Sequence, residues 1–135
     1  MLVTLYKGEA IMKTFIGNGT GAAESAVNQA LKGLESPSAI IFMAPYGALE
    51  TAAGIIMERF PDTPSIGTIG TKFHNGIVGD TNIVVLGFFE DAKISCGVME
   101  HIDLYPAVSI RKVEESIAEI APGKDRTASI FSLSS

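Results

Sequence analysis

The sequence is poor in the residues that several classes of function require. It has a single cysteine, Cys96, so it can form neither an intrachain disulfide nor a CxxC metal pair. It has no tryptophan, only 10 Lys and Arg against 15 Asp and Glu, and a formal net charge of −5 at pH 7. Nucleic-acid binding needs clustered Lys and Arg to neutralise phosphates, and the sequence has no basic stripe. We therefore expect no nucleic-acid partner.

Long apolar runs are also missing. The longest are residues 39–45 and 83–89, far short of the roughly 20 residues that a membrane-spanning helix needs. No basic segment precedes an apolar stretch at the start of the sequence, as a secretory signal would require. These absences predict a cytoplasmic protein without membrane insertion.

The residues that are abundant predict a folded domain. Hydrophobic residues make up 47% of the 135 residues and charged residues only 19%, which is too apolar for intrinsic disorder and enough for a substantial core. Fourteen glycines indicate many tight turns. The length fits one domain.

The two ends of the sequence differ from the rest. Residues 1–11 show no periodicity, and the codons for Lys7-Gly8-Glu9 can form a purine-rich ribosome-binding site just upstream of Met12. We therefore predict that translation starts at Met12 and that residues 1–11 are a mis-assigned extension of a domain over 12–135. Residues 127–135 have the pattern of a strand that stops abruptly, which predicts a domain truncated at its C-terminus.

Hydrophobic periodicity predicts alternating strands and helices. Strands are expected over 13–16, 39–44, 66–71, 82–89, 93–99 and 128–133, and helices over 23–34, 49–60 and 110–120. Residues 17–21 are expected to form a glycine-rich loop, and residues 72–80 a longer loop.

The order of these elements predicts the fold class. Alternating strands and helices favour a parallel βαβ section, and the strands at 82–89 and 93–99 are expected to pair as an antiparallel hairpin. The expected fold is therefore α/β, with a mixed β-sheet and helices packed on it as a layered sandwich.

The loop Gly17-Asn18-Gly19-Thr20-Gly21-Ala22 is the strongest candidate for ligand binding. As G-x-G-x-x-A it fits the dinucleotide fingerprint, but the fingerprint also needs an acidic residue after the second strand, which ends Met43-Ala44-Pro45-Tyr46. Two interpretations then compete with a dinucleotide site. One is a tight turn with Thr20 or Gly21 near the helix N-cap, and the other is a site where N–H groups bind a small carboxylate.

A second glycine-rich segment is Gly67-Thr68-Ile69-Gly70-Thr71-Lys72. It lacks the G-x-x-x-x-G-K-[ST] spacing of a phosphate loop. Like the first segment it follows a strand, and ligands in open α/β sheets bind at the carboxyl ends of strands. The two segments are therefore candidates to line one shallow polar site. His74 is either a solvated loop residue or a base or ligand of that site.

The remaining chemically capable residues favour structural roles. Cys96 alternates with apolar residues and fits a small core residue. His101 and Asp103 have no third metal-ligating partner nearby, and Glu50 and Glu58 lie on the polar face of a helix. We therefore expect no enzyme, no cofactor and no metal site.

The succession of motifs resembles the N-terminal FIST domain, a family named for F-box and intracellular signal transduction proteins. The resemblance covers residues 12–135. The segments that carry it are the strand into Gly17-Asn18-Gly19-Thr20, Ala39–Ala44, Arg59–Gly70 and Val84–Phe88. The sequence departs from the family pattern at Thr20, where serine is usual, and at Thr68 and Thr71, where Cys or Ser and Ala are expected.

This resemblance implies a sensory input domain of bacterial signal transduction, including chemotaxis, that senses a small ligand such as an amino acid or a small carboxylate. It also implies a C-terminal FIST half or a fused signalling output domain as a partner. The predicted ligand-binding residues are Gly17, Gly19, Thr20, Gly21, Thr68, Gly70, Thr71 and His74. Two alternatives stay open: a small α/β enzyme that acts on an acyl or phosphorylated metabolite with His74 as base, and a protein-interaction module.

Overall fold

The computed structural model describes residues 2–7, 13–70, 72–74, 77–79, 82–89, 93–96, 104–119 and 126–131. The fold class is the predicted one, a mixed α/β fold with helices packed against a mixed sheet. The chain divides into two compact units. The larger unit comprises residues 13–89, and the smaller unit comprises residues 1–12 and 90–135.

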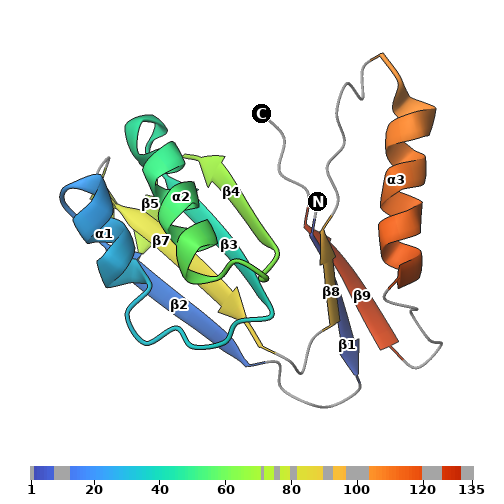
Figure 1. Cartoon of the computed structure of the whole chain (residues 1–135), viewed down its shortest axis with the longest axis horizontal. Coiled ribbons are helices and arrows are strands. Elements are labelled where there is room, and N and C mark those ends of the chain that lie inside the picture. Colours follow the sequence, from blue (N-terminus) through green and yellow to red (C-terminus); the bar gives the residue numbers. More distant parts are fainter. Residues whose placement is uncertain are drawn as a thin grey trace. The chain divides into compact units, whose positions relative to one another are not determined.

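A four-stranded sheet forms the centre of the larger unit, in the order β2-β7-β3-β4 (Figure 1). Strand β7 runs antiparallel to both of its neighbours, and β3 and β4 are parallel. Strands β2, β3 and β4 therefore point the same way, and their carboxyl ends share one edge of the sheet, the carboxyl edge. The strands are β2 (Thr14–Gly19), β3 (Ala39–Ala44), β4 (Ser65–Ile69) and β7 (Ile83–Phe88).

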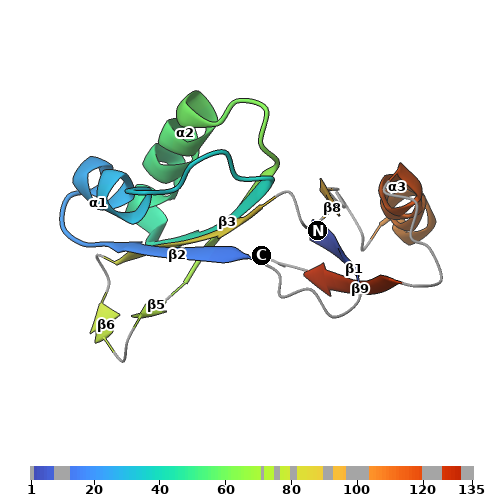
Figure 2. The same ribbon diagram turned by 90° about the horizontal axis from the view of Figure 1, so that it is seen from below.

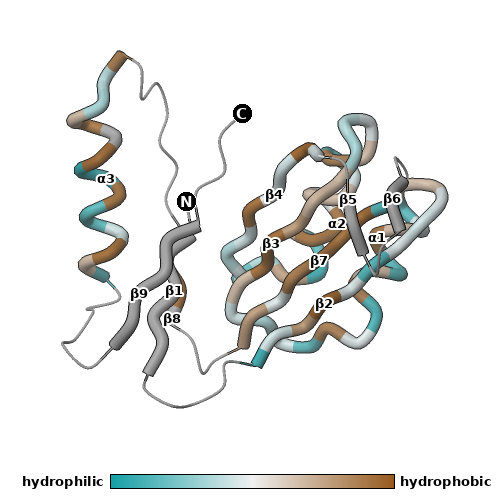
Figure 3. Tube along the Cα trace, turned by 180° about the vertical axis from the view of Figure 1, so that it is seen from behind, coloured by the Kyte–Doolittle hydropathy of each residue, from teal (hydrophilic) through white to brown (hydrophobic). Residues whose placement is uncertain are grey.

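Two helices cover one face of this sheet, as Figure 2 shows. They are α1 (Ala23–Ala30) and α2 (Leu49–Arg59), the latter preceded by the 3-10 turn η1 (Tyr46–Ala48). The core lies between helices and sheet, and its largest fully buried side chains are Leu31, Ile40, Ile56, Ile83, Val27 and Val85. Figure 3 shows hydrophobic residues along the inner strands β3 and β7, as expected for strands with a neighbour on each side.

The close packing of α1 on β2 explains why positions 17 and 19 are glycines, although the sequence predicts a loop there. In the structure β2 continues to Gly19, so this part of the loop prediction is wrong. A Cβ on Gly17 would collide with the backbone oxygen of Ala30, and a Cβ on Gly19 with that of Ala26. Because the neighbour is backbone in both cases, no side chain fits, and the helix packs directly on the strand.

The predicted loop over 72–80 contains two short strands. They are β5 (Lys72–His74) and β6 (Ile77–Gly79), which pair antiparallel. The pair stands between β4 and β7 in the chain, and β5 contacts β7. Figure 2 shows the pair on the face of the sheet opposite α1 and α2.

The smaller unit has a three-stranded antiparallel sheet in the order β8-β1-β9 and the helix α3 (Pro106–Glu119), which contacts β8. Its strands are β1 (Leu2–Lys7), β8 (Lys93–Cys96) and β9 (Arg126–Phe131). The predicted hairpin of 82–89 with 93–99 is wrong, because β8 pairs with β1 in a sheet that does not include β7.

Strand β1 lies within residues 1–11, which the sequence indicates as a mis-assigned extension. It is the central strand of the smaller sheet and pairs with both β8 and β9. A chain that started at Met12 would lack this strand. The start at Met12, the domain over 12–135 and the truncation at the C-terminus stay predictions.

Candidate functional site

Three of the eight predicted binding residues directly follow strands at the carboxyl edge of the four-stranded sheet. Thr20 and Gly21 follow β2, η1 follows β3, and Gly70 follows β4. Asn82 lies at the same edge, because it directly precedes the antiparallel strand β7. Carboxyl ends of parallel strands are the usual place for a ligand in an open α/β sheet.

The first glycine-rich segment divides into a packed part and an exposed part. Gly17 and Gly19 belong to β2 and are buried beneath α1. Thr20 is exposed, and its N–H donates to Gln29 Oε1 at 3.4 Å. Gly21 has a φ of +98°, a conformation that favours glycine. The N-cap of α1 is Ala22, without a side-chain hydrogen bond, and Gly21 directly precedes it, near the N-cap as the tight-turn interpretation predicts.

The second glycine-rich segment is described only in part. Thr68 Oγ1 donates to the backbone oxygen of Ile69 at 3.3 Å, and a Cβ on Gly70 would meet no atom within 4 Å. Thr71 lies outside the described residues. The backbone of His74 forms part of β5, and its side chain lies outside what the structure describes. The role of His74 as base or ligand therefore stays a prediction.

The two glycine-rich segments lie along the same edge of the sheet, but at its two opposite ends. Strands β2 and β4 are the outer strands of the sheet, with β7 and β3 between them. At about 4.8 Å per strand, β2 and β4 are roughly 14 Å apart. A ligand of a few atoms can therefore contact Thr20 or Thr68 but not both, and the predicted single site divides into two parts.

Two asparagines that the sequence does not single out as binding residues lie at the β2 side of this edge. Asn18 pairs across the ladder with Val84, and Asn82 is two residues before Val84. Both therefore lie at one corner of the sheet, the Asn18–Asn82 corner. Asn18 Oδ1 and Asn82 Nδ2 are buried and have no hydrogen-bond partner, and Asn82 is only 3% exposed. Such an atom costs about 1–3 kcal/mol relative to a satisfied one.

The signal that could have found these residues is an amide side chain within or directly beside an apolar strand. Asn18 is the only side chain of β2 that carries an amide, and Asn82 directly precedes the strongly apolar strand β7. Buried polar groups in proteins normally have partners, so an asparagine in such a position needs an explanation. The sequence alone does not say whether the partner is another residue or a ligand.

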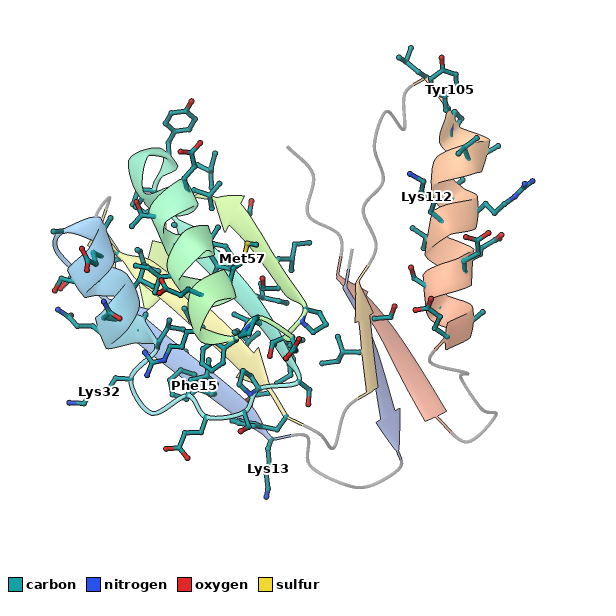
Figure 4. All side chains as sticks on the ribbon, in the orientation of Figure 1. Lys13, Phe15, Lys32, Met57, Tyr105 and Lys112 are labelled. Carbon is teal, nitrogen blue, oxygen red and sulfur yellow. The ribbon has the colours of Figure 1, made fainter. Side chains whose placement is uncertain are left out.

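The charges near the sheet are distributed unevenly between its two edges. Strands β2, β3, β4 and β7 contain no charged residue. The positively charged side chains described in the larger unit lie at the edge opposite the carboxyl edge, where β2, β3 and β4 begin. They are Lys13 before β2, Lys32 after α1 and Arg59 in the last turn of α2. Figure 4 shows Lys13 at the start of β2 and Lys32 below α1.

The carboxyl edge instead has acidic side chains. Glu24 and Glu50 lie in the first turns of α1 and α2, which begin at this edge, and both are exposed. Acidic residues there interact favourably with the helix dipoles. These two carboxylates would repel an anionic ligand that came close to them. Among the described side chains, none at the carboxyl edge is a cation that could pair with a carboxylate ligand.

Other candidate chemistry is limited. Among the described residues, no group of three or more His, Cys, Asp or Glu side chains is placed to hold a metal ion. Within the same residues, no helix combines the length and the apolar character needed to cross a membrane. Glu50 and Glu58 are exposed, as the polar face of a helix predicts. The predictions for His101, Asp103 and the side chain of Cys96 fall outside the described residues.

No family model matches the chain, and no curated protein matches it. The resemblance to the FIST domain therefore stays a prediction.

Proposed function

We propose that this chain is a cytoplasmic sensory domain of a bacterial signal transduction protein, and that it binds a small polar ligand at the carboxyl edge of β2, β3 and β4. The ligand would bind on the β2 side of that edge, beside the exposed Thr20 and Gly21. An amino acid or a small carboxylate is the ligand class that the resemblance implies.

One observation carries this proposal. Asn18 Oδ1 and Asn82 Nδ2 are both buried without partners at one corner of the sheet. Because buried polar groups are normally satisfied, two such atoms at the edge where ligands bind indicate groups reserved for a ligand.

The output of the sensor would come from another domain. The resemblance implies a C-terminal FIST half or a fused signalling domain that responds to the ligand. Neither alternative function, the small α/β enzyme or the protein-interaction module, is favoured by a specific observation on the described residues.

A thermal-shift screen of the full chain against the twenty amino acids and common small carboxylates tests the proposal. A ligand at a hundred times its dissociation constant stabilises the folded state by roughly 2.7 kcal/mol, which raises the Tm by on the order of 10 °C. Thr20→Ala should weaken the response, whereas Thr14→Ala, at the opposite end of β2, should not. A selective ligand whose affinity is the same in Thr20→Ala would place binding elsewhere and contradict the site.

A further inference from the structure

The Asn18–Asn82 corner offers one hydrogen-bond acceptor and one donor. Asn18 Oδ1 accepts a hydrogen bond, and Asn82 Nδ2 donates one. A ligand that satisfies both must carry an N–H and an acceptor oxygen close together. The edge of a primary amide or a lactam has this arrangement, because its N–H and C=O lie on the same side of the C–N bond.

The hydrogen-bonding groups of the corner disfavour a carboxylate ligand. A carboxylate has acceptors only, so it would satisfy Asn82 Nδ2 and leave Asn18 Oδ1 without a donor. A neutral amide leaves neither group without a partner, and the strands themselves contain no charge to pair with an ion.

We propose that Asn18 and Asn82 recognise the amide group of a small neutral ligand. The ligand N–H donates to Asn18 Oδ1, and Asn82 Nδ2 donates to the ligand carbonyl oxygen. The inference rests on the proposed function, since it assigns the ligand class of the same edge. It replaces the amino acid or small carboxylate that the resemblance implies with a neutral amide or lactam.

The test uses three small probes and the full chain. 2-Pyrrolidone carries the N–H and the carbonyl on one edge, N-methyl-2-pyrrolidone lacks the N–H, and propionate is the carboxylate. Titration followed by ¹H–¹⁵N NMR should show 2-pyrrolidone shifting the backbone amide of Thr20 and the side-chain NH₂ signals of Asn18 and Asn82. The N-methyl probe should bind about tenfold more weakly, because it cannot donate to Asn18. Equal affinities of the two lactams would overturn the inference.

A variant at the Asn18–Asn82 corner tests whether the probes bind through the side-chain amides. Asn82→Leu keeps the approximate size of the side chain and removes the donor, so binding of 2-pyrrolidone should be lost. The matched control is Asn28→Leu, the same substitution at an exposed asparagine of α1, which should bind as the unaltered chain does. Binding that survives in Asn82→Leu would contradict the proposal.

The unfolding of ligand-free Asn82→Leu shows whether Asn82 is reserved for a ligand or stabilises the fold through a partner in the protein. If the two amides are unpartnered without ligand, Asn82→Leu should leave the unfolding equilibrium constant unchanged or lower it, because a buried unsatisfied group is removed. A rise of more than about tenfold would show that Asn82 holds the fold through a partner, and would overturn the inference.

The outcomes also distinguish this inference from the proposed function. An amino acid or propionate that binds at the carboxyl edge while 2-pyrrolidone does not would overturn the amide assignment and support the sensor. If no probe and no compound of the thermal-shift screen acts at this edge, both proposals fail.

Discussion

The two glycine-rich segments of the larger unit look alike in the sequence, but their glycines have different neighbours. In the first segment, a Cβ on Gly17 or Gly19 would collide with the backbone of α1. In the second, a Cβ on Gly67 would collide with the ring of Phe42, which is a side chain. Gly21 and Gly70, at the ends of the two segments, would meet no atom within 4 Å.

This difference separates the part of each segment that builds the fold from the part that is open to a ligand. A glycine against backbone is fixed by the spacing of helix and strand, whereas a glycine against a ring can be replaced if the ring changes. A glycine with nothing beside it has no packing reason to be a glycine. The last glycines of both segments, Gly21 and Gly70, and not their first glycines, are therefore the places to look for binding.

The largest effect is expected from Gly19→Ala. The new methyl group would displace α1 from β2, because the atom it meets is the backbone oxygen of Ala26 and cannot rotate away. We expect the free energy of unfolding to fall by more than about 3 kcal/mol. Urea denaturation of Gly19→Ala beside Thr20→Ala, the exposed neighbour, measures it. A loss of less than about 1 kcal/mol would show that helix and strand are not packed this closely.

A smaller effect is expected from Gly67→Ala, and a second substitution should reverse part of it. Overpacking against the buried ring of Phe42 should cost about 1–3 kcal/mol of unfolding free energy. Phe42→Leu removes the ring, so the double variant should be more stable than the sum of the single effects by about 1 kcal/mol or more. The same urea denaturation of the four chains gives the coupling. Additive losses would contradict the contact between Gly67 and Phe42.

Elements that are set by local periodicity could be predicted from the sequence. The uninterrupted run 39–44 is the strand β3, and the apolar stripe over 49–60 gives α2. Pairing between strands could not be predicted in the same way. β7 and β8 are neighbours in the chain, yet β7 pairs with β2 and β3 while β8 pairs with β1, because the partner of a strand is a property of the whole fold.

In the candidate site, too, local features could be predicted from the sequence and features that depend on strand pairing could not. The sequence predicts that glycine-rich segments follow strands, and the structure places Thr20 and Gly70 at one edge. The spacing of the two segments depends on the order β2-β7-β3-β4, which no local pattern contains. Asn18 and Asn82 were missed because their unpartnered atoms become visible only when their surroundings are known.

The smallest effects come from the ends of the two segments, where Gly21 and Gly70 form a matched pair. Neither would place a Cβ against another atom, but Gly21 has a φ of +98° and Gly70 lies outside the left-handed region. Gly21→Ala should therefore cost about 1 kcal/mol through backbone strain alone. Gly70→Ala should change stability by less than about 1 kcal/mol and in the stabilising direction, because alanine restricts the unfolded chain. Denaturation of the two variants side by side checks both signs. Equal losses at the two positions would mean that an unseen contact, not backbone conformation, requires glycine at the end of the second segment.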